Sequence, residues 1–337
     1  MPWNRQKYSQ TYLSGGDDVK EIERRKNYSD STISRLKEKL KLSTRELENK
    51  GCIYLTGSFG RREASEGSDI DAFIACTGGE QSRAVSRLSE IKIKADLING
   101  TEKLRLPEFD GDGDYLRLFS FDKLIESIGS RNDDYENTFT ARLLLLLEGS
   151  PLIGEESFSD LRSSIVDAYW KDYGGHEASF IPAYFTNDVL RLWRTFCVNY
   201  EARTSDNTSE KLAKRRAKNF KLRHTRILTC YSALAMLIDS ERQKKKIDQH
   251  CILEVCLLTP TDRIERLRES ASSKAEHVLQ LYERSLEWTA KSDFKSLFSR
   301  DDFNNARRME SREFSEAFFE MLMELGRDTT LLKRLVV

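Results

Sequence analysis

The stretch of residues 55–74, LTGSFGRREASEGSDIDAFI, limits what this chain can fold into more than any other part of it. An apolar run enters it and ends at Gly57-Ser58. A polar loop then leads to Asp69 and Asp71, where a second apolar run begins. This order predicts a short strand, a glycine turn that opens a helical turn, a loop and a second strand.

The two aspartates indicate a site for a divalent cation. Side chains alternate along a strand, so Asp69 and Asp71 point to the same side and Ile70 points to the other. Two carboxylates at such a short separation repel each other. Burying both in the charged form is costly unless a cation lies between them. Mg²⁺ suits such oxygen ligands, because it keeps some of its waters and combines one or two carboxylates with substrate phosphates.

The glycine end of the stretch suits phosphate. Gly57 lets the backbone come close to a phosphate chain, and Ser58 with the first amides of the following turn offers donors at a positive helix end. One half of the stretch is therefore expected to bind phosphates and the other half to hold the metal.

This pattern resembles the DNA polymerase beta-like nucleotidyltransferase superfamily. The residues that carry the resemblance are Gly57, Ser58, Asp69 and Asp71. Arg61 and Glu63 fit the Gly-Ser-x-x-Arg-x-Glu variant of small bacterial members, and the match covers roughly residues 50–76. The resemblance implies an NTP substrate and Mg²⁺, or alternatively Mn²⁺, as cofactor. The residues expected to bind the nucleotide are Gly57, Ser58, Arg61, Arg62, Ser68 and, from farther along the chain, Arg191.

The resemblance also implies a third carboxylate on a neighbouring strand, close enough to share the metal and to help deprotonate the attacking hydroxyl. The loop before an apolar run at 115–119 offers four candidates: Glu108, Asp110, Asp112 and Asp114. We choose Asp114, at the mouth of that run, as the third metal ligand and catalytic residue beside Asp69 and Asp71. The alternative is a solvated Asp/Gly turn.

The whole chain is long enough for two domains, with 337 residues of which 39% are hydrophobic. Lysine plus arginine equals aspartate plus glutamate, at 55 each, so the net charge does not indicate a nucleic-acid partner. We expect no membrane span and no signal peptide, because no apolar run is long enough. The six cysteines form no Cys-x-x-Cys pair and lie in apolar segments, which is typical of buried thiols in a cytoplasmic protein.

The predicted fold class is α+β: a small polymerase beta-like sheet flanked by helices, followed by an all-helical domain. We assign residues 1–17 to an N-terminal arm, 18–150 to the nucleotidyltransferase domain and 151–337 to the helical domain. Helices are expected at 19–48, divided near Asp30 or Ser31, and at 81–98, 121–128 and 133–148, and short strands at 104–106 and 115–119. Beyond residue 150 we expect no strand and the helices 157–172, 183–202, 209–241, 246–258, 261–271, 273–291 and 311–334.

Two parts of the helical half could meet phosphates. Asn187, Asp188, Arg191 and Arg194 share one helix and could approach a triphosphate, or they could form ordinary intrahelical ion pairs. Residues 211–226, from Lys211 to Arg226, contain eight lysines and arginines and no acid. This stretch could dock RNA, bind the triphosphate, or be a solvated face balanced by acids elsewhere. No aromatic residue interleaves its basic face, because Phe220 belongs to the apolar stripe of the same helix, so stacking on single strands is not predicted.

The sequence therefore predicts an enzyme that moves a nucleoside monophosphate from an NTP to a hydroxyl acceptor, which could be an RNA 3′ end, a protein, a small molecule or a nucleotide. Its compact motif resembles that of small bacterial enzymes of the toxin or defence type. One alternative is a nucleotide-binding sensor without transfer activity. Another is an RNA-binding interaction protein that uses the basic helix and keeps the fold as a scaffold.

Overall fold

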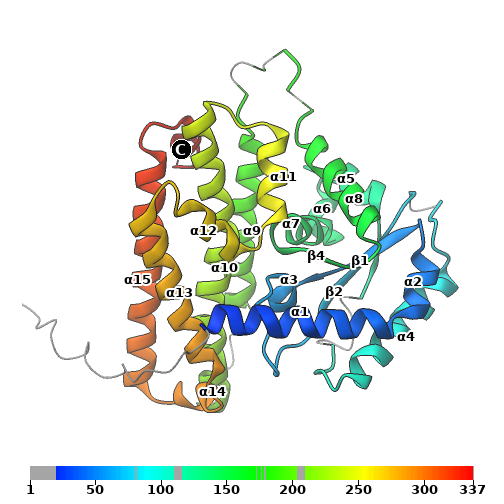
Figure 1. Ribbon diagram of the computed structural model, residues 1–337, viewed down its shortest axis with the longest axis horizontal. Helices are drawn as coiled ribbons and strands as arrows, with labels where there is room; N and C mark the ends of the chain where they lie inside the picture. The colour runs from blue at the N-terminus through cyan, green and yellow to red at the C-terminus, as the bar shows by residue number, and fades with distance from the viewer. Residues whose placement is uncertain are drawn as a thin grey trace, which may run out of the picture.

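A small sheet with its helices forms one half of the molecule, and a bundle of helices forms the other (Figure 1). The structure is a computed structural model that describes residues 20–79, 82–109, 116–171, 173–175, 177, 180–202 and 209–336. The arm predicted at 1–17 lies outside these residues. The predicted α+β architecture is confirmed.

The sheet has four strands in the order β3-β2-β1-β4, which are Leu118–Ser120, Asp71–Cys76, Gly51–Thr56 and Ser150–Ile153. β1 pairs with β2 in antiparallel register, and Thr56 lies opposite Asp71. The last residue of β1 therefore lies beside the first residue of β2. This pairing brings the glycine turn and the aspartates together.

The prediction that no strand follows residue 150 is wrong. β4 pairs with β1 in antiparallel fashion, with an irregularity between Ile53 and Tyr54. Pro151 weakened the strand signal, because proline lacks the amide that a central strand needs. The strand is tolerated at the edge of the sheet, and so the sheet extends beyond the boundary we placed at residue 150.

The helices of the first half are α1 (Glu21–Lys39), α2 (Lys41–Leu47), α3 (Gly57–Gly60), α4 (Arg87–Lys103), α5 (Phe121–Glu126), α6 (Asn132–Tyr135), α7 (Thr138–Glu148) and α8 (Glu155–Ala168). Two expectations for this half are wrong. α1 runs unbroken past Asp30 and ends before Leu40. Residues 104–106 are not a strand, because Leu104 caps α4 and Arg105 takes a left-handed φ of 55°.

Helices cover both faces of the sheet, which explains why β1 is fully buried and apolar up to Thr56. Ile53 and Leu55 face a core shared with α1, α2 and α4. Tyr54 faces the other side, where it stacks on Phe73 at 5.3 Å between ring centroids and contacts Phe158 of α8. This second core continues into the helical half.

The helices of the second half are α9 (Ala183–Ala202), α10 (Ser209–Lys244), α11 (Gln249–Leu257), α12 (Pro260–Leu267), α13 (Ser272–Ala290), α14 (Phe294–Leu297), α15 (Asp301–Gly326) and α16 (Thr330–Val336). The predicted segment 183–202 matches α9, and α10 begins where predicted. Within the described residues, no helix is long and apolar enough to cross a membrane.

α7 and α1 join the two halves. The leucines of α7 are buried on all sides, as predicted, and the helix packs against both β1 and α10. α1 extends from α13 along the sheet towards α4 (Figure 1). The guanidinium of Arg25 on α1 donates to the carbonyl of Leu286 at 2.9 Å and to the hydroxyl of Thr289 at 2.8 Å, both on α13.

None of the six cysteines, all of which lie in described residues, forms a disulfide. Five are buried, as expected for thiols in apolar segments, but Cys197 on α9 is exposed. The expectation of a buried thiol is therefore wrong at this position.

Candidate active site

A cleft of about 610 Å³ separates the motif of the sheet half from helices α10, α13 and α14 of the helical half. One wall carries six of the predicted site residues, which are Gly57, Ser58, Arg61, Ser68, Asp69 and Asp71. The facing residues on α10 and α14 are Lys218, Lys221, Thr225, Arg226 and Lys295. The cleft therefore has one acidic wall and one basic wall.

Gly57 lies directly against the carboxylate of Asp71. Its φ is +61°, a left-handed conformation that side chains disfavour, and a Cβ on Gly57 would lie 2.0 Å from Oδ2 of Asp71. Only glycine can therefore occupy this turn while Asp71 keeps its place. This contact is the physical reason for the spacing between the two halves of the motif.

Asp69 and Asp71 both line the cleft, while Ile70 between them is only 3% exposed and packs into the core. The alternation predicted from strand geometry is confirmed. Surrounding protein displaces water from Asp71 and, together with the charges of Asp69 and Glu148, raises its pKa to about 6. This local excess of negative charge, open to the cleft, fits a divalent cation.

The two serines predicted to bind the nucleotide, Ser58 and Ser68, differ in their contacts. The hydroxyl of Ser58 makes no hydrogen bond with any residue that the structure describes, although the residue lines the cleft. The hydroxyl of Ser68 accepts a hydrogen bond from the amide of Ser65 at 2.9 Å, which closes the loop before Asp69. Ser58 is thus available to a ligand, and Ser68 shapes the loop.

Glu148, the last residue of α7, supports the glycine turn from behind. Its Oε1 accepts a hydrogen bond from the amide of Gly57 at 2.9 Å, and its Oε2 accepts from Arg61 at 2.9 Å and from Thr229 at 3.1 Å. Burial alone would raise the pKa of Glu148, but Arg61 and Arg226 hold it below its usual value. The carboxylate is therefore charged and links the turn to α10.

Arg61 lines the cleft and Arg62 does not, and the guanidinium groups of both are paired within the protein. Arg61 is only 6% exposed, and its guanidinium is held by Glu63 at 2.8 Å and by Glu148 at 2.9 Å. Arg62 has a φ of 59° and pairs with Asp30 at 3.3 Å, outside the residues that line the cleft. Both guanidinium groups therefore already have protein carboxylates as partners.

Arg191 also lies outside the cleft lining. Its guanidinium pairs with Asp134 at 2.5 Å and stands 4.0 Å from the ring centroid of Phe139. Asp188 is 3.7 Å away on the same helix. The contacts of Arg191 on α9 are therefore ordinary ion pairs, the alternative that the sequence left open.

The basic stretch of α10 divides between two surfaces. Lys218, Lys221 and Arg226 line the cleft, whereas Arg215, Arg216 and Arg223 line a separate pocket. Burial and the neighbouring Lys295 lower the pKa of Lys221, and the charge of Asp69 opposes this shift. Sequence reasoning found the stretch, but it could not tell which positions face the motif.

The third carboxylate remains a prediction, because Asp114 lies outside the described residues. In the part of the chain that the structure describes, no group of three or more His, Cys, Asp or Glu side chains is arranged to hold a metal ion. Glu148 is near Asp71, but its oxygens are occupied by Gly57, Arg61 and Thr229.

Comparison with known families agrees with this geometry. Residues 37–112 match the family model described as a nucleotidyltransferase domain. The matched segment includes β1, the glycine turn, both aspartates and α4, so the resemblance drawn from the motif is confirmed for this part of the chain. No curated protein matches the chain.

Proposed function

We propose that this protein is a metal-dependent nucleotidyltransferase that moves a nucleoside monophosphate from an NTP to a hydroxyl acceptor. The observation that carries the proposal is a single cleft in which Asp69 and Asp71, beside the Gly57 turn, face Lys218 and Lys221 on the opposite wall. The family match supports nucleotidyl transfer as the general chemistry.

The two carboxylates of the acidic wall are suited to Mg²⁺, with Mn²⁺ as an alternative. Asp69 and Asp71 would hold the ion, which when bound would stabilise charge on the phosphates. Asp71 has a pKa of about 6 and is therefore ionised at neutral pH. Asp114 remains our candidate for the third ligand.

The rest of the cleft would position the triphosphate. The free hydroxyl of Ser58 and the amides of the turn donate to phosphate oxygens, and Lys218 and Lys221 balance their charge from the opposite wall. The acceptor oxygen attacks the α-phosphorus, the bond to the bridging oxygen breaks, and pyrophosphate leaves with that electron pair. The proton of the acceptor passes to a carboxylate. Catalysis then comes from positioning and electrostatics.

We propose a supporting role for Arg61 in place of direct nucleotide contact, because Glu63 and Glu148 already hold it. A cytoplasmic setting, where thiols stay reduced, remains our prediction, as does the toxin or defence type. The second candidate function is a nucleotide-binding sensor. It is favoured because, among the described residues, no third carboxylate is arranged to hold a metal ion together with Asp69 and Asp71.

Transfer can be tested with each α-³²P-labelled NTP, Mg²⁺ or Mn²⁺, and total RNA or cell lysate as the source of acceptors. Wild type should place label in one class of acceptor, and Asp69→Asn with Asp71→Asn should place none while keeping the far-UV circular dichroism of wild type. Transfer by the double variant would refute the proposal. Nucleotide binding without transfer by wild type would establish the sensor instead.

A further inference from the structure

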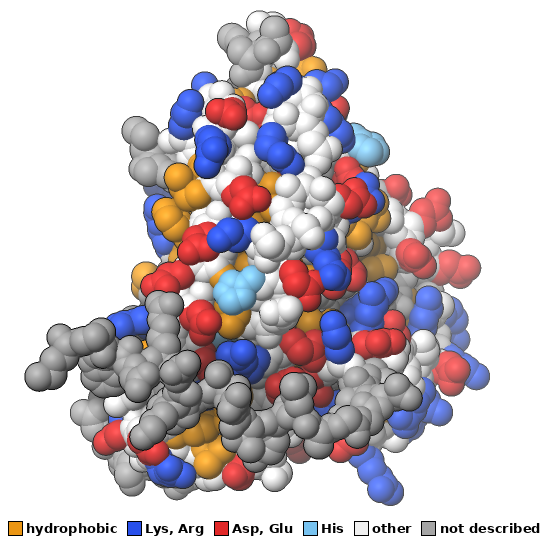
Figure 2. Space-filling view, turned by 60° about the vertical axis from the view of Figure 1, so that its left-hand side comes forward, with side chains coloured by type: hydrophobic (Ala, Val, Ile, Leu, Met, Phe, Trp, Pro, Cys, Tyr) orange, Lys and Arg blue, Asp and Glu red, His pale blue; other side chains and the backbone are white. Residues whose placement is uncertain are grey.

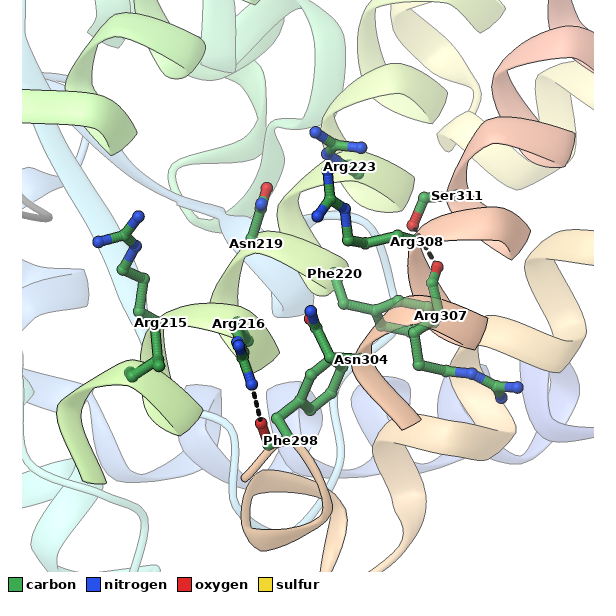
Figure 3. A pocket seen from close by; sticks show the side chains of 11 residues that line it. Arg215, Arg216, Asn219, Phe220, Arg223, Phe298, Asn304, Arg307, Arg308 and Ser311 are labelled. Atoms are coloured by element: carbon green, nitrogen blue, oxygen red, sulfur yellow. Dashed lines mark hydrogen bonds between the residues drawn. The ribbon is translucent and has the colours of Figure 1, made fainter. Parts of the chain in front are cut away.

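A second basic hollow lies outside the cleft, between α10 and α15. This arginine pocket has a volume of about 320 Å³, and no Asp or Glu is among its lining residues. Its arginines are Arg215, Arg216, Arg223, Arg307 and Arg308, drawn in Figure 3 with the other side chains that line the pocket. On the face of the molecule shown in Figure 2, by contrast, acidic and basic side chains are interspersed.

Part of this positive charge is used within the protein. Arg216 pairs with Asp301 at 2.8 Å and donates to the carbonyl of Phe298 at 3.1 Å (Figure 3). Arg307 stacks on Trp288 at 3.9 Å and pairs with Glu310 at 2.8 Å. These two arginines therefore help to build the pocket wall.

Two other arginines and two asparagines of the pocket have no such role. Arg223 and Arg308 form no ion pair with any residue that the structure describes. The side chains of Asn219 and Asn304 likewise make no hydrogen bond within the described residues, although Asn304 is only 8% exposed. Unpaired guanidinium groups suit phosphates, and amide groups suit neutral hydroxyls.

A third hollow shares lining residues with both the arginine pocket and the cleft. That hollow has a volume of about 230 Å³ and is lined by Trp193 and Phe196 of α9. Asn219 and Arg223 line both it and the arginine pocket. Leu222 and Arg226 line both it and the cleft.

The arginine pocket offers groups that bind phosphate. The third hollow, next to it, offers aromatic side chains, and the cleft beyond holds the carboxylates of Asp69 and Asp71. A positively charged groove with aromatic side chains is the arrangement that binds single-stranded nucleic acid. The aromatic residues come from α9 and not from α10, so the sequence of the basic stretch alone did not reveal them. Unpartnered amides beside the arginines favour RNA, because its 2′-hydroxyl can donate and accept hydrogen bonds.

We propose that the acceptor is a single-stranded RNA, whose backbone phosphates occupy the arginine pocket and whose 3′-terminal region follows the aromatic hollow into the cleft. This inference rests on the proposed transfer function. It adds the acceptor class and a binding site on α10 and α15, away from Asp69 and Asp71.

RNA binding can be measured without transfer, by fluorescence anisotropy of a labelled oligoadenylate in the absence of NTP. Arg223→Gln with Arg308→Gln should weaken binding by about tenfold or more and should reduce the slope of log K against log salt by about 1.4, or 0.7 for each lost phosphate contact. Arg35→Gln with Arg327→Gln is the matched control, because both arginines are exposed and neither forms an ion pair with a described residue. This control should leave binding nearly unchanged.

Two further comparisons test the site. Arg308→Glu reverses a charge at an exposed helix position and should weaken binding at least as strongly without affecting folding. An oligodeoxyadenylate of equal length should bind more weakly than the RNA, and Asn304→Ala should reduce this difference. Equal losses in the pocket variant and the control would overturn the site, and equal affinity for RNA and DNA would overturn the preference for RNA.

Failure of the RNA-binding proposal can be distinguished from failure of the transfer proposal. Pocket-dependent RNA binding without any transfer would retain the RNA site and refute the transfer function. Transfer of label to a small molecule, with no RNA binding, would retain the transfer function and refute the RNA acceptor.

Discussion

Glu148→Gln tests how the two halves of the molecule position the glycine turn. The substitution keeps the size of the side chain but removes its charge and one of its two acceptor oxygens. Oε1 receives the amide of Gly57, and Oε2 receives Arg61 and Thr229. Either orientation of the new amide therefore places an NH₂ group against a donor.

The expected loss in the free energy of unfolding follows from the burial of Glu148 and its partners. Glu148 is 3% exposed, Arg61 is 6% exposed, and the side chain of Arg226 near the same carboxylate is 20% exposed. Breaking a buried ion pair by removing one partner costs about 3–5 kcal/mol. Because Glu63 still pairs with Arg61, we expect the lower end, about 3 kcal/mol, which is a large part of the 5–15 kcal/mol typical of a domain.

Urea unfolding of wild type and Glu148→Gln measures the change in the free energy of unfolding, and calorimetry measures NTP affinity. We expect affinity about tenfold lower, because the turn loses the acceptor that fixes its first amide. Glu38→Gln, at an exposed position on α1, is the control and should change neither quantity. A Glu148→Gln variant as stable as wild type would refute the role assigned to this carboxylate.

Two further predictions concern Gly57 and His224. Gly57→Ala should reduce transfer by about a hundredfold in the labelled-NTP assay, because its Cβ would lie 2.0 Å from Oδ2 of Asp71, whereas Gly174→Ala meets no atom within 4 Å and should be silent. Burial lowers the pKa of His224 from 6.5 to about 4, so its folded form resists protonation and stability is lost as the pH falls from 6.5 towards 4. Over this range wild type should lose about 3 kcal/mol more than His224→Leu in urea titrations, and parallel curves for the two proteins would contradict the assignment.

The motif was predictable because its signals are local. The alternation of a strand predicted Asp69 and Asp71 on one side and Ile70 on the other, and the structure shows this arrangement where the chain enters β2 at Asp71. The glycine turn was also clear from sequence, although its contact with Asp71 depends on the pairing of Thr56 with Asp71 across two strands.

The partners of the motif were not predictable, because they come from distant segments. Glu148 could have drawn notice as the single acid of a largely apolar helix, but nothing local shows that it meets Gly57. Arg61 and Arg191 read as phosphate ligands from sequence alone. Each instead pairs with a carboxylate far along the chain, Glu148 and Asp134 respectively.

The surfaces that the basic stretch 211–226 serves were likewise not predictable from the sequence. Its charge was evident from sequence, but only the packing of α10 between α9, α13 and α15 sends Lys221 into the cleft and Arg223 into the arginine pocket. A helix places successive residues on different faces, so one charged run can serve two surfaces.

The central claim is that Asp69 and Asp71 hold a divalent cation together with the nucleotide. Electron paramagnetic resonance of Mn²⁺, titrated with protein in the presence of ATP, measures this without knowledge of the acceptor. Wild type should bind the Mn²⁺–ATP complex, and Asp69→Asn with Asp71→Asn should not. The control, Asp160→Asn with Asp328→Asn at two exposed positions, should behave as wild type. Equal binding of Mn²⁺–ATP by the Asp69/Asp71 variant and wild type would contradict the account.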